Sequence, residues 1–154
     1  MALDSSAPIR DESTVKPDIG VFLCKCGKNI GGSVDVDALA EAIKDIPSVK
    51  HIQVNTYTCS EPGQAEIETA IAEQKLEKIV IAACSPRLHG PTWQELLRRS
   101  ELNPSLVEVA NIREQCSWVH LHAKAEGTQK ALELIQMAIA RAELLQPVAE
   151  MKVP

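Results

Sequence analysis

Four cysteines in this chain follow short apolar runs, and thiols at such positions can ligate a metal or undergo redox chemistry. They are Cys24, Cys59, Cys84 and Cys116, at or just past the runs at 19–23, 51–55, 79–83 and 106–110. A fifth, Cys26, lies in the glycine-rich loop after the first run. If the runs are parallel strands, their carboxyl ends share one edge of a sheet, where open α/β sheets bind ligands. The sequence therefore predicts one site to which several distant loops contribute sulfur.

The arrangement of the thiols indicates the kind of centre. Thiolates with few carboxylates beside them suit an iron–sulfur cluster or a thiolate zinc site. Zinc sites usually contain Cys-x2–4-Cys pairs, which this sequence lacks, whereas single cysteines from separate loops are more typical of an enclosed cluster. We predict one [4Fe-4S] cluster with Cys59, Cys84 and Cys116 as ligands and Cys24 or Cys26 as the fourth.

Basic residues accompany the cysteines, and their charges would offset the negative charge of a cluster with four thiolates. They are Lys25, Lys28, Arg87 and Arg113. After Cys59 and Cys84 the chain passes through Ser and a Pro-marked turn into a helical pattern, so helix N-termini would face the sulfurs and lower thiol pKa values. His89 and His120 are expected to make local hydrogen bonds rather than to bind metal.

The same cysteines are also compatible with two other functions. The spacing of Cys24 and Cys26 is compatible with a carrier that acts by thiol–disulfide exchange. A structural zinc domain that serves the assembly of a complex is a further alternative. A single cysteine at the end of a buried strand is often a small core residue, but this explanation is weaker for four of them together.

From Ile19 onward, β-like runs alternate with helical patterns along the chain, as in βαβ units. These elements must position the cysteines and the basic residues. Helices are predicted over 35–46 with Asp35 as N-cap, from Pro62 to about 74, over 91–99 and over 127–145. We expect an α/β fold, a doubly wound, mostly parallel four-strand sheet of Rossmann or flavodoxin type with flanking helices. The strand order stays open, and no Gly-x-Gly-x-x-Gly motif supports a dinucleotide site.

Length and composition exclude several classes of protein. A chain of 154 residues, 45% of them hydrophobic, can form one domain without disulfides. The net charge of −5 and scattered basic residues argue against nucleic acid, and no apolar stretch approaches the roughly 20 residues of a membrane span. Five cysteines suit a reducing cytoplasm.

We expect a flexible extension over 1–17, an iron–sulfur-binding domain over 18–146 and a linker-like tail over 147–154.

The cysteine segments resemble the N-terminal domain of the heterodisulfide reductase A subunit, the flavin and iron–sulfur subunit of methanogens and many anaerobic bacteria. The similar stretches are IGVFLCKCGKNI at 19–30, YTCSEPG at 57–63, VIAACSPR at 80–87 and ANIREQCSWVH at 110–120. Together with the last helix they cover about residues 18–145. The resemblance implies a domain that accompanies an FAD-binding, thioredoxin-reductase-like module and further ferredoxin-type clusters.

Such complexes pass electrons between hydrogenase or formate dehydrogenase partners, ferredoxin and disulfide substrates. The family's flavin module would begin about where this chain ends, so FAD is expected only on a neighbouring module or subunit. We therefore expect an electron-transfer component of an oxidoreductase complex, without complete catalytic machinery of its own. Its expected partners are other heterodisulfide-reductase-like subunits, the flavin module and ferredoxin-type carriers.

Overall fold

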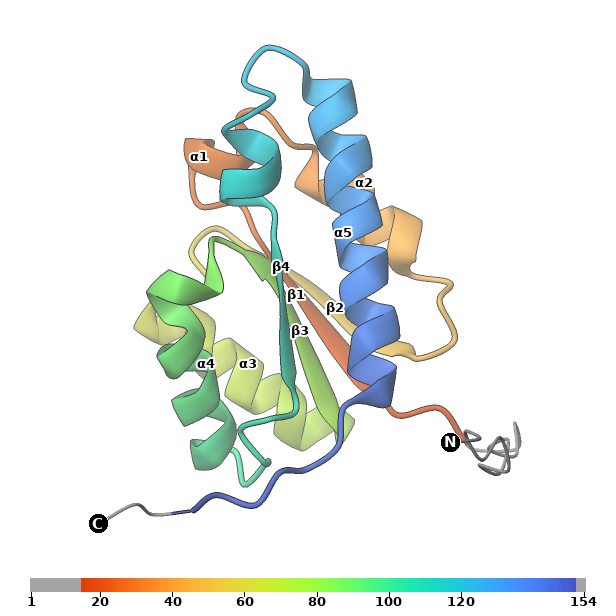
Figure 1. Ribbon diagram of the computed structural model, residues 1–154, viewed down its shortest axis with the longest axis vertical. Helices are drawn as coiled ribbons and strands as arrows, with labels where there is room; N and C mark the ends of the chain where they lie inside the picture. The colour runs from red at the N-terminus through yellow and green to blue at the C-terminus, as the bar shows by residue number, and fades with distance from the viewer. Residues whose placement is uncertain (1–14, 152–154) are drawn as a thin grey trace, which may run out of the picture.

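A parallel sheet lies between two layers of helices in the computed structural model, which describes residues 15–151 (Figure 1). The strands are β1 (Ile19–Cys24), β2 (Val49–Asn55), β3 (Lys78–Ala83) and β4 (Val107–Asn111). They lie in the order β2-β1-β3-β4, and each neighbouring pair is parallel. The predicted α/β fold is confirmed. The order is of the flavodoxin type, in which β1 and β3 flank the point where the chain switches direction across the sheet.

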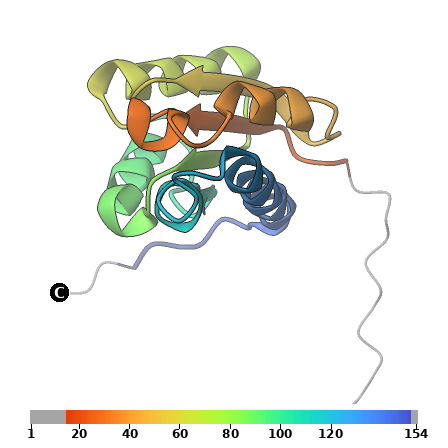
Figure 2. The ribbon, with the colours of Figure 1, turned by 90° about the horizontal axis from the view of Figure 1, so that it is seen from above.

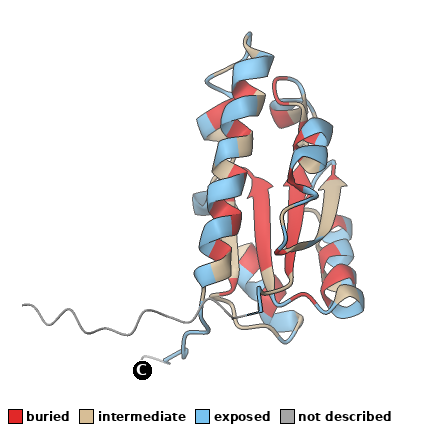
Figure 3. Ribbon diagram, turned by 90° about the vertical axis from the view of Figure 1, so that its right-hand side faces the viewer, coloured by how far each residue is buried: buried red, intermediate tan, exposed pale blue. Residues whose placement is uncertain are grey.

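The helices cover both faces of the sheet (Figure 2). They are α1 (Lys28–Gly31), α2 (Val36–Ile43), α3 (Glu61–Gln74), α4 (Pro86–Arg99), the short π-helix η1 (Arg113–Ser117) and α5 (Lys124–Leu144). Successive side chains of a strand point to opposite faces, so Val21 and Leu23 pack in the core beneath α2 and α5, whereas Phe22 packs beneath α3 and α4. The buried residues accordingly lie on the strands and on the helix faces towards them (Figure 3).

Capping residues fix where the helices begin. Asp35 caps α2 as predicted, because its side chain accepts a hydrogen bond from the Ala38 N–H. The predicted start of the third helix at residue 91 is wrong, since α4 begins at Pro86, and Ser85 caps it. Pro91 lies inside that helix. A proline inside a helix removes a hydrogen bond of that helix, whereas one in the first turn does not. For this reason the sequence predicted that the helix begins at Pro91.

The two ends of the sheet carry different features. The carboxyl ends of the strands point to the end of the molecule that carries α1 and η1, and the described chain ends leave at the opposite end (Figure 1). Most of the predicted extension over 1–17, and residues 152–154 of the predicted tail, lie outside the described residues. No helix in the described range is long and apolar enough to cross a membrane.

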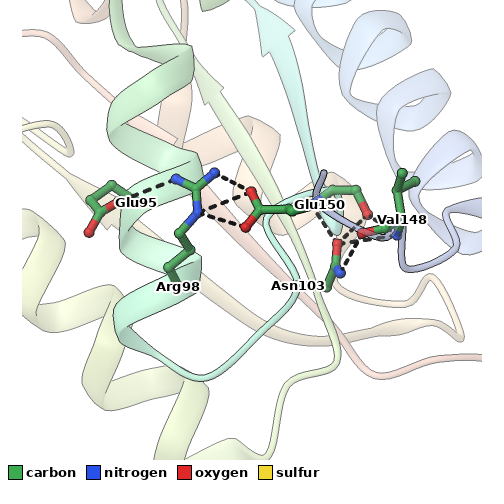
Figure 4. Close-up of polar contacts among 6 residues, drawn as sticks. Glu95, Arg98, Asn103, Val148 and Glu150 are labelled. Atoms are coloured by element: carbon green, nitrogen blue, oxygen red, sulfur yellow. Dashed lines mark hydrogen bonds and ion pairs between the residues drawn. The ribbon is translucent and has the colours of Figure 1, made fainter. Parts of the chain in front are cut away.

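The chain after α5 docks at the amino end of the sheet (Figure 4). The side chain of Asn103 donates to the Val148 carbonyl at 2.9 Å, and the Val148 N–H donates to the Ser105 hydroxyl at 3.1 Å. Arg98 of α4 forms an ion pair with Glu150. We call these contacts of residues 146–150 the tail site.

Candidate metal centre

Cys24, the last residue of β1, accepts hydrogen bonds from two backbone amides. The N–H groups of Cys26 and Thr58 lie 3.3 Å and 3.4 Å from its Sγ. The side chain is 4% exposed, so water contributes little to its solvation. The Cys24 Sγ also donates to the Thr56 carbonyl at 3.7 Å, so backbone groups on two sides hold this sulfur in place at the end of β1.

Cys26 lies in a turn that folds back over the end of the sheet. Its φ of 44° and that of Gly27, 56°, are both left-handed, a conformation that is uncommon for a non-glycine residue and often occurs at functional sites. The positive φ of Gly27 favours glycine at this position, where an added Cβ would also approach the Tyr57 hydroxyl to 2.7 Å. The turn brings the Cys26 Sγ to 3.8 Å from Nη1 of Arg113.

Cys59 and Cys84 stand just before α3 and α4, beyond the ends of β2 and β3. Burial raises the pKa of both thiols, Cys24 and Cys26 raise that of Cys59 further, and Arg113 lowers both. Cys59 and Cys26 also raise the pKa of Cys84. Cys24, Cys26, Cys59 and Cys84 all stand at the carboxyl ends of β1, β2 and β3, and the hydrogen bonds from the Thr58 N–H to Cys24 and from the Ser85 N–H to Glu114 join their loops at this edge of the sheet. We call these four cysteines the four-thiol group.

Cys116 packs in a different core from Cys24. It is fully buried in η1 and belongs to the hydrophobic core that includes α2 and α5. Burial raises the pKa of its thiol, and the charge of Lys130 lowers it. Cys24, by contrast, packs in the core that includes α3 and α4. Cys24 and Cys116 therefore lie in different cores, and Cys26 packs against both of them.

Arg113 is the predicted basic residue that contacts a thiol. Its Nη2 lies 2.9 Å from Glu114, and its guanidinium lies 4.8 Å from the centre of the Trp118 ring. The other oxygen of Glu114 accepts a hydrogen bond from the Ser85 N–H at 2.9 Å, which ties η1 to the start of α4. Burial lowers the pKa of Arg113, but hydrogen bonds to Glu114 and Cys26 raise it more. A fixed positive charge is thus held against the four-thiol group.

The other three predicted basic residues face outward. Lys25 forms an exposed ion pair with Asp37 at 2.9 Å. The side chains of Lys28 and Arg87 are exposed to solvent. Their charges can act on the four-thiol group through solvent, where screening weakens them.

The two histidines make local hydrogen bonds, as predicted. Nδ1 of His120 lies 2.8 Å from the Cys116 carbonyl, and Nδ1 of His89 lies 3.4 Å from the Thr92 hydroxyl. Within residues 15–151, no group of three or more His, Cys, Asp or Glu side chains is arranged to hold a metal ion. The ligand sulfurs of a [4Fe-4S] cluster bind different irons, so they stand farther apart than those on one ion.

Buried polar atoms without partners add evidence about what this edge can hold. In the described chain the buried side-chain atoms that lack a hydrogen-bond partner are Ser48 Oγ, Asn55 Oδ1, Thr58 Oγ1, Ser100 Oγ and Arg113 Nε. Thr58 and Arg113 already donate other N–H groups to thiols of the four-thiol group. A buried unsatisfied donor costs roughly 1–3 kcal/mol, and the sulfides of a cluster would supply acceptors. The residues present therefore fit an iron–sulfur cluster.

The fold and this edge define an α/β domain that gathers cysteine thiols, backbone amides and a partly buried arginine at the end of a parallel sheet. No family model matches the chain. Proteins similar to it are nevertheless found among the heterodisulfide reductases.

The chain is 45% identical over 144 residues to the A subunit of the H(2):CoB-CoM heterodisulfide,ferredoxin reductase of Methanothermobacter thermautotrophicus, covering 94% of the chain and 22% of the relative. It is 46% identical over 138 residues to the second iron-sulfur A subunit of the CoB–CoM heterodisulfide reductase of Methanopyrus kandleri, covering 90% and 21%. It is 44% identical over 131 residues to the A subunit of the ferredoxin:CoB-CoM heterodisulfide reductase of Methanosarcina mazei, covering 85% and 16%.

These identities confirm the resemblance predicted from the cysteine segments. The chain is a homologue of part of the heterodisulfide reductase A subunit. It spans about a fifth of the length of the first two relatives, which is consistent with one domain of the larger protein.

Proposed function

We propose that the chain is an iron–sulfur electron-transfer domain, which holds one [4Fe-4S] cluster at the four-thiol group and relays single electrons within a heterodisulfide-reductase-like complex. The observation that carries this proposal is that four thiols stand at the carboxyl ends of three neighbouring strands, where hydrogen bonds join their loops and Arg113 contacts Cys26. The names of the relatives, which include a ferredoxin reductase and an iron-sulfur subunit, support it.

A bound cluster would supply one-electron chemistry, and the protein would supply its ligands, charge balance and shielding. The four-thiol group would provide the thiolates, and two backbone N–H groups point at the Cys24 sulfur. Arg113 would offset part of the negative charge, with Glu114 and Trp118 fixing its position. In this arrangement both Cys24 and Cys26 are ligands, and Cys116, which the sequence-based set included, has a packing role.

The partners follow from the same proposal. FAD would lie on a neighbouring module or subunit, and other subunits or ferredoxin-type carriers would donate and accept the electrons. All five cysteines are free of disulfides, and free thiols suit the reducing cytoplasm. We propose that the domain works in that compartment.

Metal analysis of protein purified without oxygen tests the proposal. We expect about four irons and four acid-labile sulfides per chain, with broad visible absorption that bleaches on reduction. Zinc without sulfide would instead indicate an assembly domain. Absence of both metals, together with a reversible disulfide, would indicate a thiol–disulfide carrier. Either of these last results would overturn the proposal.

A further inference from the structure

Thr58 carries a hydroxyl for which the described chain provides no partner. The residue is 0% exposed, and its Oγ1 is buried without a hydrogen bond. Its backbone N–H donates to the Cys24 Sγ at 3.4 Å, and it directly precedes Cys59. The unpaired hydroxyl therefore belongs to a residue that is held between two members of the four-thiol group.

An unpaired hydroxyl alone does not mark a site, because Ser48 and Ser100 also have one. Thr58 differs in its place, since its own backbone already contacts a thiol. The thiols do not accept a hydrogen bond from its hydroxyl in this structure, so an acceptor for it would have to come from an added group. The inorganic sulfides of an iron–sulfur cluster are acceptors of this kind.

We propose that the Thr58 hydroxyl donates a hydrogen bond to a sulfur of the cluster held by the four-thiol group and raises its reduction potential. This inference rests on the proposed function. A hydrogen bond to a cluster sulfur stabilises the more negative, reduced form, so its loss lowers the potential. The step affected is the addition of one electron from a chemical reductant such as dithionite, in which no covalent bond forms or breaks.

The test compares the Thr58→Val and Thr58→Ser variants with the unaltered chain, all purified without oxygen. Valine has a similar shape and no hydroxyl, and serine keeps the hydroxyl. We expect Thr58→Val to retain iron but to show a reduced-to-oxidised ratio about three- to tenfold lower at a fixed solution potential, where tenfold corresponds to about 59 mV for one electron. Thr58→Ser should stay close to the unaltered chain.

Thr69→Val is a matched control. Thr69 is exposed on α3, and its hydroxyl donates to the Ala65 carbonyl at 2.9 Å. The substitution removes the same group away from the four-thiol group, so the potential should not change.

A structural role for the Thr58 hydroxyl predicts a different result. If the hydroxyl stabilised the protein itself, Thr58→Val would lower the urea midpoint of the metal-free chain, and that result would overturn the inference. We expect the metal-free variant to be at least as stable as the unaltered chain, because an unsatisfied buried group has been removed.

The outcomes separate this inference from the proposed function. Full iron content with an unchanged potential in Thr58→Val overturns the inference and leaves the proposed function intact. Loss of iron in Thr58→Val but not in Thr58→Ser supports a hydrogen bond to the cluster, whereas loss in both variants overturns it. Absence of iron and sulfide from the unaltered chain overturns the proposed function itself.

Discussion

The tail site and the four-thiol group lie at opposite ends of the sheet and are completed in different ways. At the tail site, Asn103 exchanges hydrogen bonds with both backbone groups of Val148, and Arg98 pairs with Glu150 (Figure 4). The Ser105 hydroxyl also donates to a backbone carbonyl of the tail, 3.0 Å away. Protein groups therefore supply the partners for these contacts.

At the four-thiol group, backbone amides donate to a sulfur, and two buried donors have no partner in the described chain. The donors are Thr58 Oγ1 and Arg113 Nε. Burial raises the pKa of the Cys59 and Cys84 thiols, so the lowering predicted from the helix N-termini is wrong for these two residues. The tail site therefore finds its hydrogen-bond and ion-pair partners within the folded chain. The four-thiol group instead has donors and ligands for an added, negatively charged group.

The largest effect that this comparison predicts is that of Cys84→Ala. The variant should lose the cluster or convert it to a smaller one, and its thermal stability should fall because metal binding and folding are coupled. Iron per chain and the visible spectrum measure the first effect, and thermal unfolding measures the second. Full iron with an unchanged spectrum would refute the role of Cys84.

Cys116→Ala is the matched control. It removes the same atom from the other core, so we expect unchanged iron content and a loss of about 1 kcal/mol from the small cavity. Loss of iron in this variant would restore Cys116 to the ligand set predicted from the sequence.

A smaller effect is expected of Arg113→Met, which keeps most of the side-chain volume but removes the charge beside Cys26. Hydrogen bonds to charged groups contribute about 1.5 kcal/mol or more, so iron affinity in competition with a chelator should fall roughly tenfold. Arg87→Met, at an exposed position, should leave the affinity unchanged. An equal loss of iron affinity in the two variants would show that Arg113 has no specific role beside the four-thiol group.

The stability of the metal-free chain should depend on pH through its buried thiols. Burial raises the pKa of Cys59, Cys84 and Cys116 above the ordinary 9.0. Above pH 9 the unfolded chain therefore loses thiol protons that the folded chain still holds. The stabilisation is complete below that pH and is lost as the pH rises through the folded pKa values.

Urea unfolding at about pH 8 and about pH 10 measures this dependence. We expect a lower midpoint at the higher pH, and a smaller decrease in Cys116→Ala, which removes one contributing thiol. A midpoint that does not fall at the higher pH would contradict the assigned burial.

The smallest effect is expected at the tail site. Arg98→Met removes exposed ion pairs with Glu95 and Glu150, and exposed ion pairs contribute little to stability. Chemical unfolding should show this small loss, with iron content unchanged. Coupled loss of iron would mean that the two ends of the sheet do not behave independently.

The sequence predicted the elements better than their arrangement. Short apolar runs and helical spacing are local signals, so the four strands and the cap at Asp35 could be predicted. The order β2-β1-β3-β4 depends on which way each crossover turns, and this is not a local property. The starts of α1 and η1 were missed because four and five residues are too few to show a period.

The site was predicted in part for a similar reason. The position of a cysteine at a strand end indicates the edge of the sheet but not the face, which the following turn decides. Cys24 and Cys116 consequently pack in different cores. Thr58 and Glu114 have no spacing signal beyond lying next to a cysteine or an arginine, and their roles appear only when the loops are brought together.

Anomalous X-ray diffraction at the iron absorption edge, from crystals grown without oxygen, tests the central claim most directly. We expect iron density bonded to the sulfurs of Cys24, Cys26, Cys59 and Cys84, within reach of the Thr58 hydroxyl and Arg113. Density against Cys116 with the four-thiol group unbound, or no iron in protein that has kept its cofactors, would contradict it.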